Sequence, residues 1–187
     1  MAMPGRWRGR TMAGLALAFA FAAAPPLAAQ TDAKWQVFRD RALGFTFDYP
    51  PGWSARVGCH GSRRCVAVRN GQGGQQAYAI ALEEFAGNLE RTATNKAVFR
   101  RTQEGWVAEG RYASHPAQPI AEDGWRGLEA VVDCGISDGG EMHAAAGECL
   151  WAVLSDGRRS IVADTQGTVA NDEDVHRVLR SVRFVSR

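Results

Sequence analysis

The sequence has very little lysine, no apolar run long enough for a transmembrane helix and none of the common catalytic motifs. Lys34 and Lys96 are its only lysines, whereas arginine is plentiful, a bias typical of GC-rich bacterial genomes. The glycines of NGQGG precede a strand-like segment rather than a helix, so they do not form a nucleotide-binding loop. Hydrolase or thiol chemistry would need a nucleophile elbow or a Cys-x-x-Cys pair, and neither is present. We therefore predict a protein that is not an enzyme and that needs no cofactor.

Residues 1–29 are organised like a secretory signal peptide. Three arginines form a basic region, an uncharged run follows over residues 11–24, and small residues surround Pro25. The uncharged run is shorter than the roughly 20 apolar residues that a bilayer-spanning helix needs. We therefore predict cleavage near Ala29 or Gln30, rather than retention as an anchor, and a location in the periplasm or outside the cell.

The remaining residues, 30–187, are predicted to form a single domain with its own core. Loss of the three arginines of the N-terminal segment changes the formal net charge from +2 to slightly negative. A nearly neutral domain has no general electrostatic reason to bind nucleic acid or anionic membranes. We therefore predict a protein or an envelope component as the partner, with no nucleic acid and no stable membrane span. The oligomeric state is left open.

The four cysteines, Cys59, Cys65, Cys134 and Cys149, are expected to form two disulfides, because export would place them in an oxidising compartment. Three pairings are possible in principle. We favour Cys59 with Cys65 and Cys134 with Cys149, since each bond would close one loop between neighbouring segments. A closed loop of about 15 residues stabilises a fold by roughly 3 kcal/mol in the chain-entropy model.

Strand signals occur along most of the mature chain. Phe45, Phe47 and Tyr49 alternate with polar side chains, which is the pattern of a half-buried strand, and Pro50 ends it. An Asp-Gly turn after Ser155 predicts a tight hairpin. The further predicted strands cover residues 33–38, 65–70, 76–85, 105–113, 125–136, 149–154 and 160–165, with a loop at 114–119.

Two segments have helical spacing. Residues 88–101 place apolar side chains at Leu89, Ala93 and Ala97, with Asn88 as the N-cap. The second helix, within residues 171–184, begins with acidic residues and has one apolar face made of Val175, Val178, Leu179 and Val182. Antiparallel strands with interspersed helices predict an α+β domain.

Both ends of the mature chain resemble the PsbP-like family. LGFTFDYPPGW, residues 43–53, resembles that family's opening strand with its Tyr-Pro-x-x-Trp turn. VHRVLRSVRF, residues 175–184, resembles its closing helix and Ser-x-x-Phe strand. The resemblance implies a central antiparallel β-sheet flanked by helices, an α/β/α sandwich. It also implies a binding, assembly or accessory role without enzyme chemistry.

Two sets of soft ligands support an alternative hypothesis, an exported metal-handling protein or thiol-dependent enzyme. Cysteine and histidine bind zinc or copper. The spacings, however, are not those of a zinc ribbon or knuckle, so we predict structural disulfides and no metal site. The two sets are Cys59, His60 and Cys65, and Cys134, His143 and Cys149.

Four other residues are of the types used in hydrolase sites. Ser114 and His115 are adjacent, and Glu83 and Glu84 could supply a carboxylate. No motif places these side chains together, and carboxylates of this kind are mostly exposed. We predict no catalytic residue and interpret all four as surface positions.

Arginines gather around the first cysteine pair. Arg63, Arg64 and Arg69 would form an anion-binding or docking face if the fold brought them together. They are the predicted binding residues. The predicted function is an exported, non-enzymatic accessory or binding protein of the bacterial cell envelope.

Overall fold

The computed structural model describes residues 34–70, 79–134, 136–138, 141–143, 147–165 and 172–186. The chain divides into two units, Met1–Asp32 and Ala33–Arg187, and every described residue belongs to the second. The predicted signal peptide, the loop around NGQGG and the side chain of His143 therefore lie outside the described residues.

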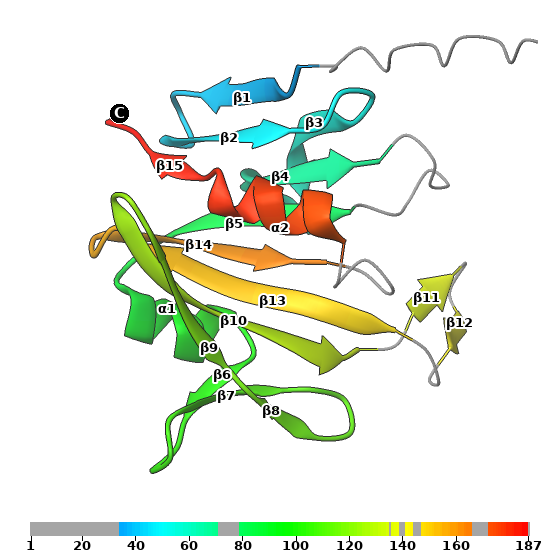
Figure 1. The fold of residues 1–187 in the computed structure, drawn as a ribbon, viewed down its shortest axis with the longest axis vertical. Helices are drawn as coiled ribbons and strands as arrows, with labels where there is room; N and C mark the ends of the chain where they lie inside the picture. Colours follow the sequence, from blue (N-terminus) through cyan, green and yellow to red (C-terminus); the bar gives the residue numbers. More distant parts are fainter. Residues whose placement is uncertain are drawn as a thin grey trace, which may run out of the picture. The chain divides into compact units, whose positions relative to one another are not determined.

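An antiparallel sheet of seven strands forms the middle of the second unit (Figure 1). The interior strand β13 is apolar almost throughout, and both of its faces are covered, with Leu150, Ala152 and Leu154 on one side and Cys149 and Val153 on the other. In spatial order the strands are β3 (Ser54–Cys59), β4 (Ser62–Arg69), β5 (Ile80–Ala86), β14 (Arg159–Asp164), β13 (Glu148–Ser155), β10 (Trp125–Asp133) and β9 (Gln118–Glu122).

One face of this sheet is covered by helix α2 (Glu173–Arg180) and by a three-stranded sheet of β1 (Gln36–Asp40), β2 (Phe45–Tyr49) and β15 (Arg183–Phe184). Asp172 caps α2 by accepting hydrogen bonds from the backbone N–H groups of Asp174 and Val175. The Trp125 indole donates to the Val182 carbonyl across 2.9 Å and so fastens the end of the helix to β10. The predicted apolar face of this helix is confirmed by its buried residues, Val175, Val178, Leu179 and Val182.

The opposite face is covered by helix α1 (Leu89–Lys96) and a small sheet of β6 (Phe99–Arg101), β7 (Trp106–Glu109) and β8 (Ser114–Pro116). Ala93 of α1 and Phe99 of β6 pack here against Leu128 and Val153. The remaining strands, β11 (Ile136–Asp138) and β12 (Glu141–His143), pair with each other. The seven-stranded sheet thus separates two apolar cores.

The predicted α/β/α sandwich is wrong. Each face of the central sheet has one helix of eight residues, and a small β-sheet supplies the rest of its cover. The described part of the chain is therefore mostly β-sheet. The resemblance suggested helical layers, whereas much of the covering chain pairs as short strands.

Two local predictions also need correction. The helix predicted over residues 88–101 ends at Lys96, because residues 99–101 extend and pair with β7. The loop predicted at 114–119 contains β8 and the start of β9. Its prolines, Pro116 and Pro119, are compatible with strands because these strands lie at sheet edges, where a missing N–H donor is tolerated.

Candidate functional site

Ser114 and His115 lie close to acidic groups but do not form a catalytic pair. Consecutive residues of a strand point to opposite faces, so the two side chains diverge. The Ser114 hydroxyl donates to Glu109 Oε2 at 2.6 Å, and His115 Nε2 lies 2.5 Å from Asp133 Oδ1. No nucleophile in this cluster is therefore aligned with the histidine as a base.

The carboxylates of this cluster are stabilised in their charged form. The hydrogen bond with His115 is the main cause that lowers the pKa of Asp133, and the backbone N–H of Tyr112 adds to it. Hydrogen bonds from Ser114 and then Arg100 lower the pKa of Glu109. A general base would instead need a pKa raised toward neutrality, so both carboxylates act as structural acceptors.

All four cysteines form disulfides in the predicted local pairing, Cys59 with Cys65 and Cys134 with Cys149. A thiolate nucleophile or thiolate metal ligand would require a free cysteine. In the part of the chain that the structure describes, no three histidine, cysteine or acidic side chains gather as a metal site. The thiol-dependent alternative thus has no thiol to use in this oxidised state.

Arg64 has a structural role that the sequence analysis missed. Its Nε donates to Glu84 Oε2 at 3.0 Å, and its Nη2 contacts the same oxygen. Glu84 is 1% exposed, so the prediction that it lies at the surface is wrong. Its alternation with the core residues Ile80 and Leu82 along β5 could have signalled this burial.

The hairpin of β3 and β4 holds the predicted arginines in place. Its turn residues His60 and Gly61 both have positive φ, +51° and +73°, as a type I′ turn requires. Between the pairs Val57–Val66 and Cys59–Ser62 the register shifts, so that Gly58 faces the three residues Arg63 to Cys65. The Cys59–Cys65 disulfide ties the two strands together across this bulge.

A shallow hollow of about 370 Å³ lies along this hairpin, and we name it the hairpin hollow. Ser54 is opposite Arg69 and Arg56 is opposite Ala67, so these four side chains share one face of the sheet. The lining consists of Ser54, Arg56, Val57, Gly58, Ala67 and Arg69.

The three predicted binding arginines are therefore not equivalent. Arg69 lines the hairpin hollow, Arg63 is exposed in the bulge, and Arg64 pairs with Glu84. Arg56 belongs to the same surface as Arg69 but was missed, because strand β3 was not predicted. Pairing Ser54 to Cys59 with the next strand in the sequence would have revealed it.

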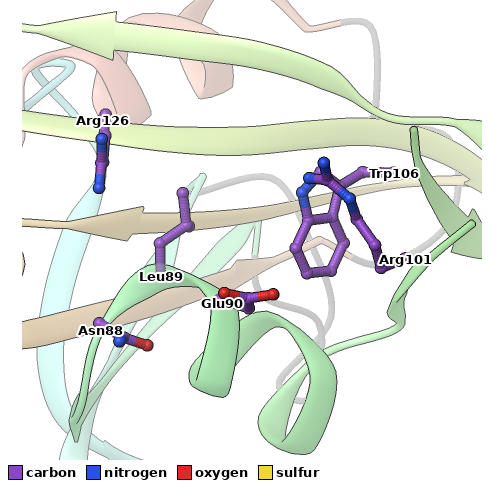
Figure 2. A pocket seen from close by; sticks show the side chains of 6 residues that line it. All are labelled: Asn88, Leu89, Glu90, Arg101, Trp106 and Arg126. Carbon is purple, nitrogen blue, oxygen red and sulfur yellow. The ribbon is translucent and has the colours of Figure 1, made fainter.

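A second hollow of about 380 Å³ lies beside the first turn of α1 (Figure 2). The guanidinium carbon of Arg101 lies 5.4 Å from the centre of the Trp106 ring, a cation–π contact. In Figure 2, Leu89 lies between Arg126 and the Arg101–Trp106 pair. The lining residues are Asn88, Leu89, Glu90, Arg101, Trp106 and Arg126. This lining contains Glu90 as well as two arginines, so it is less clearly suited to an acidic ligand than the hairpin hollow is.

Together these features define a mainly antiparallel β protein with two disulfide-closed loops and shallow hollows that contain arginine. Among the described residues, neither helix has the length and apolar character needed to cross a bilayer. No family model matches the chain. No curated protein matches it either.

Several solved structures are similar to this one at low identity. A protein of Bacteroides thetaiotaomicron has a TM-score of 0.48 and 10% identity over 81% of this chain, which spans only 49% of that protein. Cyanobacterial PsbP of Synechocystis sp. PCC 6803 has a TM-score of 0.42 and 15% identity, and covers 86% of this chain and 98% of its own. The Ran-binding protein Mog1p of Saccharomyces cerevisiae has a TM-score of 0.42 and 9% identity. The match covers 83% of this chain and 97% of Mog1p.

A cyanobacterial PsbP is thus among the structural neighbours. At such low identity a similar fold implies neither a shared partner nor a shared activity. Function has to be argued from the surface of this chain.

Proposed function

We propose that this chain is an exported, non-enzymatic binding or accessory protein of the bacterial cell envelope. Its export rests on the signal-peptide pattern of residues 1–29, and its two disulfides are compatible with an oxidising compartment. The partner is a protein with an acidic surface, and it docks on the hairpin hollow.

One observation carries the proposed docking site: arginines surround a small-residue surface that a disulfide holds rigid. Arg56 and Arg69 flank Ser54 and Ala67 on one face, and Arg63 is exposed in the bulge of the same hairpin. Arg56 and Arg63 form no ion pair among the described residues. Arginine donates to carboxylates in a bidentate geometry, which makes such a surface specific for acidic partners.

Affinity capture tests this proposal. The tagged mature protein is immobilised and exposed to envelope extract, and bound proteins are identified by mass spectrometry. The double variant Arg56→Glu and Arg63→Glu should lose the partner, because it reverses one charge in the hairpin hollow and one in the bulge of the same hairpin. Arg39→Glu with Arg41→Glu is the matched control, since it makes the same change in charge at the distant β1 strand and its turn.

Equal capture by both variants would contradict docking at the hairpin hollow. Turnover of a defined substrate by the purified protein, with loss of turnover on mutation of a single residue, would contradict the non-enzymatic role.

A further inference from the structure

Strand β3 leaves one edge of the seven-stranded sheet open. It is the first strand in the spatial order, and among the described residues it pairs only with β4. An open edge exposes unpaired N–H and C=O groups that can accept another strand. The sequence of β3, SARVGC, contains neither proline nor lysine, the residues that commonly protect such an edge.

Two of the other sheet edges are less suited to strand addition because they contain proline. Strand β9, at the far edge of the same sheet, has Pro119 near its centre, and the edge strand β8 ends at Pro116. Proline lacks the N–H donor that a ladder needs. The bulge of the hairpin begins after Val57, so Ser54 to Val57 keep a regular register with β4. This stretch of β3 is the regular, proline-free part of the edge.

The two faces of β3 have different chemistry. Arg56 is exposed on the face of the hairpin hollow, and Arg69 lies on the neighbouring strand of the same face. Val57 lies opposite Val66 on the other face and is 47% exposed. A strand added beside β3 would therefore meet arginine on one side and an apolar surface on the other.

We propose that the partner binds by adding an extended segment to the β3 edge, and that this segment alternates acidic and apolar residues. Its acidic side chains face Arg56 and Arg69, and its apolar side chains cover Val57. The inference rests on the proposed function and specifies how the partner is recognised. A second copy of this chain is a poorer occupant, because antiparallel pairing of two β3 strands would bring Arg56 of each copy close to the other and like charges repel across strands.

A synthetic peptide tests this binding mode directly. The probe is a capped, fluorescently labelled peptide of about seven residues, the length of a typical strand, which alternates glutamate and valine. We expect saturable binding by fluorescence anisotropy, and slower amide hydrogen exchange at Ser54 to Val57 when the peptide is bound. A peptide of the same composition with its glutamates grouped together should bind at least about tenfold more weakly, because it cannot satisfy both faces at once.

Backbone pairing is separated from charge attraction by a second peptide. N-methylation on one edge keeps every side chain but removes the donors that pair with β3, so binding should fall by roughly tenfold or more. Lysine in place of glutamate should abolish binding. In the protein, Arg56→Glu should weaken binding of the parent peptide, whereas Arg39→Glu on the edge strand β1 should leave it unchanged.

The outcomes distinguish this inference from the proposed function. Equal binding of the parent and N-methylated peptides would overturn strand addition while leaving an acidic docking surface in place. Failure of every peptide to bind, together with arginine-dependent capture from envelope extract, would also overturn strand addition alone. Loss of arginine dependence in both experiments would overturn the proposed function as well.

Discussion

At the scale of single residues, Arg64 shows how a half-exposed arginine can compensate a buried charge. Its guanidinium group neutralises a carboxylate that is almost completely removed from water, since Glu84 is 1% exposed. Removal of one partner leaves the other charge poorly solvated. An arginine that the sequence places in a cluster thus has a structural partner, Glu84.

We expect Arg64→Ala to lower the free energy of unfolding by about 1–3 kcal/mol, the usual cost of leaving a buried group without its partner. Urea unfolding followed by circular dichroism measures this change. Arg63→Ala is the control, because Arg63 is exposed and such substitutions usually stay within about 0.5 kcal/mol.

The double variant Arg64→Ala with Glu84→Gln separates the charge effect from lost packing. It should recover part of the stability that Arg64→Ala loses, because the uncompensated buried charge is gone. A loss from Arg64→Ala no larger than that from Arg63→Ala would show that the ion pair contributes nothing.

The contribution of Asp133 to stability should depend on pH. Its pKa is lower in the folded protein than in the unfolded chain, chiefly because of the hydrogen bond with His115. Its contribution is therefore complete near neutral pH and is lost as the pH falls through the folded-state pKa. Asp133→Asn should lower the melting temperature at pH 7, and the difference from the unmodified protein should shrink below about pH 4.

Differential scanning calorimetry between pH 3 and pH 7 measures this effect. Glu122→Gln, at the exposed end of β9, is the control and should cause no comparable difference at pH 7. A difference for Asp133→Asn that stays constant across this range would contradict the assigned role.

At the scale of secondary-structure elements, the two disulfides should contribute unequally. They close loops with sequence separations of 6 and 15 residues. The chain-entropy model gives about 2 kcal/mol for the shorter loop and about 3 kcal/mol for the longer one. Replacing each pair by alanines should therefore destabilise the protein more at Cys134–Cys149 than at Cys59–Cys65, as measured by urea unfolding.

Within the β3–β4 hairpin, the order should be reversed: local stability should depend more on the Cys59–Cys65 bond than on the Cys134–Cys149 bond. Hydrogen exchange at Ser54 to Val57 should accelerate markedly when Cys59 and Cys65 are replaced, because that bond closes the hairpin itself. Equal acceleration from the distant pair would mean that exchange reports global unfolding only.

The sequence predicted individual elements better than it predicted their packing. Alternating Phe45 and Phe47 correctly indicated a strand with a buried face, and both are almost fully buried. Helix starts at Asn88 and Asp172 follow local capping chemistry, which is visible in sequence. The early end of α1 was missed because Phe99 to Arg101 extend only through pairing with β7, a tertiary effect.

The candidate site was only partly visible for the same reason. The arginines near the cysteines were evident, but which strand face each one occupies depends on register and on the bulge after Val57. A bulge changes which residues oppose one another, and no simple period in the sequence marks it. Arg56 and the buried Glu84 therefore emerged only from the structure.

At the scale of the whole molecule, the layers that cover the seven-stranded sheet differ most from the prediction. A sheet face needs apolar cover, and either a helix or a second sheet supplies it. Here one short helix and one small sheet share each face of the seven-stranded sheet. Helical cover was inferred from family resemblance, whereas the strands at residues 36–40 and 106–116 have short and irregular patterns that leave the choice open.

The proposed export can be tested on the chain that includes residues 1–29. Expressed with residues 1–29 in a bacterial host, the protein should be recovered from the periplasm with a new N-terminus near Ala29 or Gln30. Intact mass spectrometry of the periplasmic fraction measures the cleavage site. Replacing Leu15 and Leu17 by aspartate should leave the uncleaved chain inside the cell, because the apolar region is interrupted. Normal processing of that variant would contradict a signal peptide.

The disulfide across the β3–β4 hairpin also makes the order of maturation matter. The cytoplasm keeps thiols reduced, so Cys59 and Cys65 can join only in an oxidising compartment. An open, proline-free strand edge is a hazard for a nascent chain, because it can pair with other unfinished chains. Under the proposed export, the hairpin is closed only after oxidation, so the regular β3 edge forms in the compartment of the proposed partner rather than during synthesis.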